Sequence, residues 1–154
     1  MKKIHETVLR ALKELELSYN YDEEDGVFNY RIPTDNTSYY QRLLPLEELE
    51  MLISVTNFPI MIPEDKRFIF VNLLNKLNLK LQLGYFVLDP EDGELTFRIV
   101  CPVDKGAINT TIVIVAIGNG INTMEKYFHE FLTALGTKTA LTQSQNTEEY
   151  HAYA

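Results

Sequence analysis

The sequence predicts an α+β fold in which helices pack on an antiparallel sheet. Apolar residues recur every three or four positions in three separate segments, which is the spacing of amphipathic helices. Between these segments apolar and polar residues alternate, and Asp25-Gly26 and Asp92-Gly93 stand where hairpin turns need a positive φ. A length of 154 residues suits one domain, which we place at 1–136. The remaining residues, 137–154, predict a polar, mobile tail.

The first part of the chain predicts a helix followed by a hairpin. A helix over 2–15 is predicted by an apolar stripe at Ile4, Val8, Leu12 and Leu15. A strand begins near Ser18 and leads into an acidic turn, and a second strand follows over 27–32. The stretch 35–44 starts with turn residues, and its second half fits either a strand or irregular structure, so its conformation stays open.

The middle of the chain predicts a strand, a helix and a second hairpin. The alternation from Leu49 to Thr56 predicts a half-buried strand. Pro63 suits a first helical turn, and Gly84 suits a helix end. Between them, a second helix is predicted by the apolar stripe Phe70, Leu74, Leu77 and Leu81. Strands over 85–88 and 95–101 then flank a turn.

The segment after residue 106 contains a conflict between residue preference and spacing. Residues 110–117 are rich in β-branched side chains, which favour a strand. The apolar spacing nevertheless predicts one long helix that passes through Gly118 and Gly120 and ends near Gly136. The stripe consists of Ile114, Ile117, Ile121, Met124, Phe128, Phe131 and Leu135. Each interior glycine costs about 1 kcal/mol, so we expect a weak point or bend there.

Composition excludes several classes of function. The net charge of -8 opposes binding to nucleic acid or to an anionic membrane surface. The longest apolar run, 112–117, is far shorter than the ~20 residues of a membrane span. A single cysteine, Cys101, forms no internal disulfide, and the first 16 residues do not resemble a signal peptide, so we expect a cytoplasmic protein.

The sequence contains no recognisable catalytic, cofactor or metal site. Its three histidines, His5, His129 and His151, lack partners at zinc-like spacing. Cys101 ends an apolar alternation and fits a buried, unreactive thiol better than a nucleophile. Gly118-Asn119-Gly120 lacks the third glycine and the preceding strand of a dinucleotide-binding motif. We therefore expect a protein that is not an enzyme and that holds no cofactor or metal.

One region of the chain resembles a known family. The residues concerned are Leu74-Asn75, Leu77-Asn78, Gly84-Tyr85-Phe86, Leu88-Asp89, Asp92-Gly93 and Phe97-Arg98. Together with the preceding Phe58–Pro63, they are similar to the YbjN-like bacterial family. The resemblance implies a fold like that of the type III secretion chaperones. The elements predicted above run in the order helix, three strands, helix, two strands, helix. The resemblance also implies a homodimer and a sensory or regulatory role.

Three further features have alternative interpretations. Phe58, Ile60, Met61 and Ile62 form an apolar run between prolines, which either fills the core beneath the second helix or forms a partner or dimer surface. Asn72, Asn75 and Asn78 share one helix edge, where they either tether the helix to a strand or bind a ligand. Arg98 is either a solvated or paired surface charge or an anion-binding residue.

These observations lead to two functional hypotheses. The first is a non-enzymatic cytoplasmic protein-binding module with a chaperone-like or regulatory role, acting as a homodimer with a possible protein client. The alternative is a small-molecule sensor or an unrecognised enzyme, with a pocket between the sheet and the third helix near Gly118.

Overall fold

The structure is a computed structural model and describes residues 2–105 and 107–136. Its strands are β1 (Asn20–Asp22), β2 (Val27–Pro33), β3 (Ser38–Leu46), β4 (Met51–Asn57), β5 (Tyr85–Leu88) and β6 (Leu95–Pro102). Its helices are α1 (Lys3–Glu14), α2 (Arg67–Asn78), which follows the 3-10 turn η1 (Glu64–Lys66), and α3 (Thr110–Leu135). The tail predicted over 137–154 lies outside the described residues.

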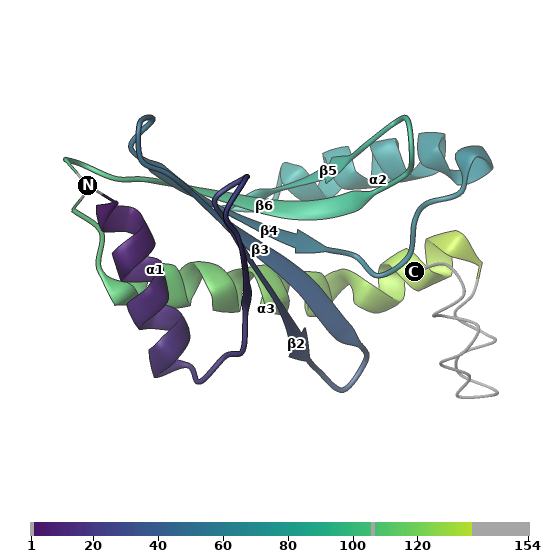
Figure 1. Cartoon of the computed structure of the whole chain (residues 1–154). Helices are drawn as coiled ribbons and strands as arrows, with labels where there is room; N and C mark the ends of the chain where they lie inside the picture. The colour runs from purple at the N-terminus through teal and green to yellow at the C-terminus, as the bar shows by residue number, and fades with distance from the viewer. Residues whose placement is uncertain (1, 106, 137–154) are drawn as a thin grey trace.

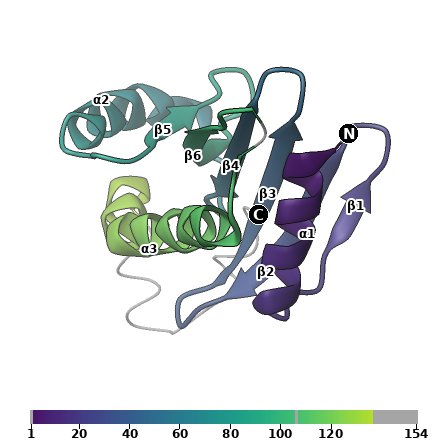
Figure 2. The same cartoon turned by 90° about the vertical axis from the view of Figure 1, so that its left-hand side faces the viewer.

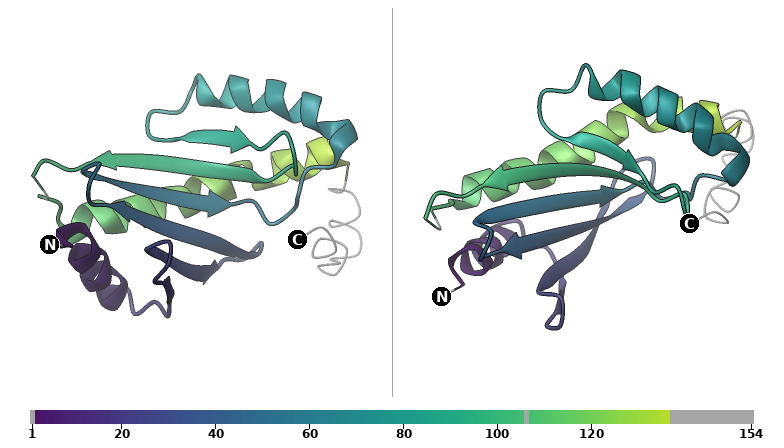
Figure 3. Two further views of the ribbon diagram at one scale, coloured as in Figure 1. Left: turned by 45° about the horizontal axis from the view of Figure 1, so that its top comes forward. Right: turned by 90° about the horizontal axis from the view of Figure 1, so that it is seen from above.

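The strands form one antiparallel sheet in the order β1-β2-β3-β4-β6-β5. Helices α1 and α3 contact each other and the central strands, so they cover one face of the sheet. Helix α2 lies along β5 at one edge (Figures 1 and 2). In both views of Figure 3 the strands lie in front of α3, and no described helix covers the face toward the viewer. We call this second face the open face.

The stretch that the sequence left open is mostly a central strand, so four strands precede α2 and the predicted count of three was wrong. β3 pairs with β2 on one side and with β4 on the other. Its residues alternate strictly between the two faces, and Tyr39, Gln41 and Leu43 are buried against the helices. The half-buried strand predicted after Leu49 is confirmed as β4. Its helix-facing side carries Leu52, Ser54 and Thr56.

A buried polar network lies at the centre of the helix-covered face. The Gln41 side chain donates from Nε2 to Thr56 Oγ1 over 2.8 Å and to the Ile117 carbonyl oxygen over 3.1 Å. Its Oε1 accepts from the Tyr30 hydroxyl over 2.5 Å. Because a buried amide costs little once its donors and acceptors are paired, the sheet accommodates glutamine here and is linked to α3 through it.

The long third helix is confirmed, and it continues as one α-helix through both glycines. Gly120 is buried where α3 crosses the sheet. A Cβ atom there would collide with Thr56 Oγ1 and would lie 2.7 Å from Gln41 Nε2. Gly118 faces open space. The absent side chain at Gly120 therefore allows the backbone of α3 to approach the polar network closely.

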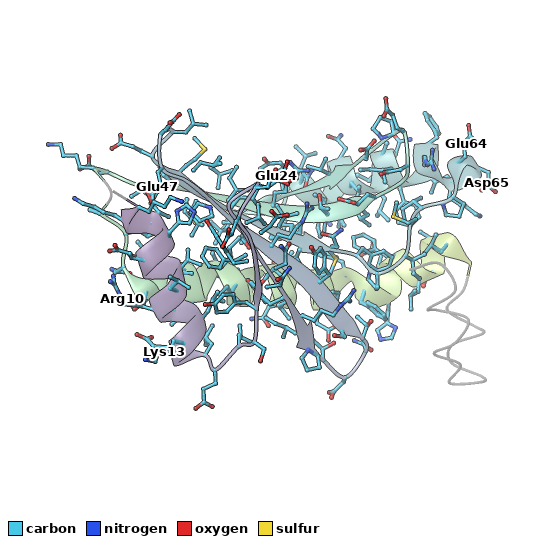
Figure 4. The ribbon with its side chains drawn as sticks, viewed as in Figure 1. Arg10, Lys13, Glu24, Glu47, Glu64 and Asp65 are labelled. Atoms are coloured by element: carbon cyan, nitrogen blue, oxygen red, sulfur yellow. The ribbon has the colours of Figure 1, made fainter. Side chains whose placement is uncertain are left out.

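The predicted first helix is also confirmed, and a distant glutamate fixes its beginning. No side chain within α1 caps its N-terminus. Instead Glu47, in the turn between β3 and β4, accepts from the backbone N–H of Ile4 over 2.7 Å and from that of His5 over 3.1 Å. Figure 4 shows Glu47 at the N-terminal end of α1. The carboxylate thus pairs two of the otherwise unpaired N–H groups and faces the positive end of the helix dipole.

Candidate protein interface

The apolar run between the prolines fills the core. Phe58, Ile60 and Ile62 are each at most 3% exposed and belong to the core cluster beneath α2 and α3. Met61 is 37% exposed. Of the four residues predicted as a partner or dimer surface, Met61 is the one that is accessible on the isolated chain.

A larger apolar surface lies on the outer side of α2. Its buried side carries Phe70, Leu74 and Leu77, as the sequence stripe predicted, but the helix ends at Asn78, before the fourth stripe residue Leu81. On the outer side Phe68 is 79% exposed, and both Ile69 and Val71 are about half exposed. We define these three residues as the α2 patch. Large apolar side chains gathered on an exposed helix face are typical of a surface that binds another protein.

The α2 patch borders a groove that extends to the C-terminal half of α3. The groove has a volume of about 750 Å³ and is open to solvent. Its lining is mostly apolar and comes from Phe68, Ile69, Asn72, Leu73, Lys76, His129, Glu130, Thr133 and Ala134. A solvent-open groove between two helices, with a mostly apolar surface and polar residues among its lining, suits the docking of a protein segment rather than the enclosure of a small ligand.

The sequence of α2 contains more apolar residues than its buried stripe accounts for, and this surplus indicates the α2 patch. Of the twelve residues of α2, seven are apolar: Phe68, Ile69, Phe70, Val71, Leu73, Leu74 and Leu77. A helix that buries one side needs only three or four apolar residues in every two turns. The surplus, concentrated in the first turn, indicates a second apolar side.

The asparagines of α2 have structural roles in two of three cases. The Asn78 side chain donates to the Phe86 carbonyl oxygen over 3.1 Å and accepts from the Phe86 N–H over 2.7 Å. It therefore pairs the outer edge of β5 as a neighbouring strand would, which confirms a helix-to-strand tether. Asn72 donates within the helix to the Phe68 carbonyl oxygen. Asn75 makes no side-chain hydrogen bond within the described part of the chain.

The remaining candidates for chemistry are held in structural arrangements. Burial raises the pKa of the Cys101 thiol, which lowers its thiolate content. Glu125, four residues before His129, accepts from Asn36 and from the Tyr39 hydroxyl. No group of three or more His, Cys, Asp or Glu side chains within residues 2–105 and 107–136 is arranged to hold a metal ion.

The space between α3 and the sheet is filled at Gly120. Gln41 and Thr56 occupy the position that a side chain at Gly120 would take. The alternative hypothesis of a small-molecule sensor or unrecognised enzyme predicts a pocket between the sheet and this helix near Gly118, but the side chains of Gln41 and Thr56 occupy the space at Gly120. No helix in the described part of the chain is long and apolar enough to cross a membrane.

Comparisons with known proteins agree with this architecture. A family model, YbjN, described as "Putative bacterial sensory transduction regulator", matches residues 5–133. A chain of the ExsC-ExsE complex is 18% identical with a TM-score of 0.59, and the match covers 81% of this chain and 90% of that chain. No curated protein sequence matches the chain.

Two other solved structures share the fold. A chain of the HopA1-SchA chaperone-effector complex is 16% identical with a TM-score of 0.56, covering 80% of this chain and 91% of that chain. YbjN from E. coli is 9% identical with a TM-score of 0.51, and the match covers 88% of this chain and 91% of that chain. The fold is therefore the type III secretion chaperone-like fold that the resemblance implied.

Proposed function

We propose that the chain, which belongs to the YbjN family, is a non-enzymatic protein-binding module of the cytoplasm with a chaperone-like or regulatory role. The observation that carries this proposal is the α2 patch, where Phe68 is 79% exposed on a helix already packed through its other side. Exposing such side chains to water is unfavourable, and covering them with a second protein removes that cost.

The first protein to cover the α2 patch is a second copy of the chain. Two copies related by a twofold axis bring the same surface together, so one apolar patch is self-complementary. The patch residues carry no charge, so two copies meet without like-charge repulsion. We therefore propose a homodimer in which α2 packs against α2 of the partner, with the exposed Leu79 beyond its end extending the contact.

The dimer then presents its remaining surfaces to a protein client. This part of the proposal is supported by the fold shared with a chain of a complex described as chaperone and effector. Two properties agree with it: Met61, which is not part of the α2 patch, is accessible, and no metal-binding cluster occurs within residues 2–105 and 107–136. A binding module needs surfaces rather than a reactive centre.

Native mass spectrometry and light scattering of the purified protein test the dimer. We expect a dimer for the wild-type chain and a monomer for Phe68→Glu, because the variant would bury a carboxylate from each copy in an apolar contact. Leu49→Glu is the matched control, since Leu49 is 64% exposed in the turn between β3 and β4. A wild-type monomer, or a dimer that survives Phe68→Glu, would contradict the assignment of α2.

A second experiment tests the client. The tagged wild-type protein and its Phe68→Glu variant are incubated with lysate from the source organism, and the captured proteins are identified. We expect the wild type to retain one defined partner at constant stoichiometry in native mass spectra. The capture of nothing reproducible would contradict the chaperone-like role without affecting the dimer.

A further inference from the structure

The open face of the sheet combines a cationic row with an apolar row. The strand register places Arg42 of β3 next to Val55 of β4, and Val55 next to Arg98 of β6. One register step further along, Arg31 of β2 lies opposite Tyr40. Toward the other end of the strands, an apolar row crosses the same face and consists of Leu44, Ile53 and Val100.

The arginines of the open face are only weakly neutralised. The chain has five arginines and a net charge of -8, yet three of the five lie on this one face. Arg42 has one ion pair, a contact of 3.5 Å with Glu94, and both side chains are about one third exposed. Within residues 2–105 and 107–136, Arg31 and Arg98 have no ion pair.

Aromatic contacts orient two of these cations. The Arg31 guanidinium lies 5.4 Å from the centroid of the Tyr40 ring, and that of Arg42 lies 6.0 Å from the same centroid. Tyr40 also donates from its hydroxyl to Asn29 Oδ1 over 2.6 Å, which fixes the ring. Because stacked guanidinium groups lose less freedom when they form a hydrogen bond, they are suited to binding carboxylates.

We infer that the open face binds an acidic, leucine-rich or valine-rich segment of a partner protein. This inference rests on the proposed protein-binding function and names the chemistry of the client. The client's carboxylates pair with Arg31 and Arg98 and compete with Glu94 for Arg42, while its apolar side chains cover Leu44, Ile53 and Val100. Charge complementarity favours an acidic partner, since a basic segment would meet three arginines. A second copy would meet the same arginines if it docked through its own open face.

Labelled synthetic peptides test the inference. The probe is a repeat of Glu-Glu-Leu-Leu, which places a carboxylate and an apolar side chain on both sides of an extended chain. The comparison peptides replace Glu with Lys or Leu with Ser. Fluorescence anisotropy should show binding of the Glu-Glu-Leu-Leu peptide only, and this binding should weaken as salt is added. Equal binding of the Lys peptide, or no binding of the acidic one, would overturn the inference.

Variants then locate the binding site. The double variant Arg42→Gln with Arg98→Gln should lose about tenfold or more in affinity, because charge-assisted pairs are removed. The control is Arg10→Gln with Lys13→Gln, which changes the net charge equally on α1, away from the open face (Figure 4). An equal loss in both would overturn the inference, since it would mean that only net charge matters.

A charge-reversed variant should gain affinity for a basic peptide, which a misfolded protein would not do. Arg98→Glu should weaken the acidic peptide and strengthen the Lys-Lys-Leu-Leu peptide. Light scattering of the Arg42→Gln and Arg98→Gln double variant separates this inference from the proposed dimer. A wild-type dimer that becomes a monomer in this variant would overturn the inference by making the open face a self-association surface. Failure of the α2 dimer alone leaves peptide binding unchanged.

Discussion

At the scale of single residues, two glycines two positions apart in α3 have opposite roles. A methyl group at Gly120 would collide with Thr56 and Gln41 in the buried polar network, whereas one at Gly118 would meet nothing within 4 Å. Spacing of glycines along a helix therefore says little about their function. The surface that each glycine meets determines whether its missing side chain is required.

This contrast leads to a paired stability prediction. Gly120→Ala should lower the free energy of unfolding by about 2–3 kcal/mol, because Thr56 and Gln41 must move from their hydrogen bonds. Gly118→Ala should raise it by about 0.5–1 kcal/mol through helix propensity alone. Urea unfolding measures both. Equal changes in the two variants would mean that the approach of α3 to the sheet is not tight.

The burial of Tyr30 leads to a prediction about protein stability at alkaline pH. Burial raises the pKa of Tyr30 well above its usual value of 10.0. The unfolded chain therefore loses the Tyr30 proton at a lower pH than the folded protein does. As a result, the contribution of this proton to the free energy of unfolding is complete below about pH 10 and declines above it. Tyr30→Phe should cost about 1 kcal/mol at neutral pH through the lost bond to Gln41. The free energy of unfolding of this variant should also fall less steeply as the pH rises above about 10.

Urea unfolding at a series of pH values from neutral to strongly alkaline tests the Tyr30 prediction. Tyr19→Phe is the control, because Tyr19 is 44% exposed. We expect it to keep the slope of the wild type. An unchanged slope in Tyr30→Phe would show that other groups cause the alkaline loss.

At the scale of elements, the side-chain amide of one residue, Asn78, pairs the outer edge of β5. Asn78 pairs both the N–H and the carbonyl oxygen of Phe86. Asn78→Ala should expose that edge and cost about 1–3 kcal/mol, since both backbone groups lose their partner. Asn75→Ala, on the exposed part of the same helix, should change stability little. Hydrogen exchange at Phe86 is the direct measurement, and unchanged protection in Asn78→Ala would contradict the tether.

The start of α1 depends on a turn that lies over forty residues away. Glu47→Ala removes the acceptor for the Ile4 and His5 N–H groups, so we expect a loss of about 1–2 kcal/mol. Glu48→Ala is the control, because its side chain is exposed. Thermal unfolding of both variants measures the difference. A loss of the same size in Glu48→Ala would point to the general charge of the turn instead.

Sequence patterns predicted the three α-helices of the described residues because each has a clear apolar stripe. They also predicted the two hairpins whose turns contain Asp-Gly, but not the hairpins on either side of β3. β3 was left open because turn residues precede it and because Gln41, a polar residue, occupies a fully buried position and interrupts the alternation. Periodicity also could not show that Leu52, Ser54 and Thr56, rather than Met51 and Ile53, face the helices. That choice depends on partners distant in sequence, such as Ile117, which bonds Gln41.

The candidate surface was harder to predict than the fold. Phe58, Ile60 and Ile62 have the composition of an interface, but the loop folds back beneath α2 and buries them. The exposed Phe68 and Val71 belong to a helix whose other side accounts for its predicted stripe. Apolar periodicity identifies the side of a helix that packs against the core. It does not show whether a second apolar side remains uncovered.

At the scale of the whole molecule, dimerisation through α2 should couple stability to protein concentration. If only folded chains associate, raising the concentration shifts the population toward the folded dimer and raises the Tm. We expect such a rise for the wild type and a Tm independent of concentration for Phe68→Glu. Scanning calorimetry across a hundredfold range of concentration measures this difference.

The same measurement separates the two proposed surfaces. The Arg42→Gln and Arg98→Gln double variant alters the open face, so it should keep the concentration dependence of the wild type while losing the acidic peptide. Phe68→Glu should show the reverse, because its open face is intact. A molecule that uses α2 for itself and the open face for its client must satisfy both expectations. If one variant abolished both properties, a single surface would have to serve both partners.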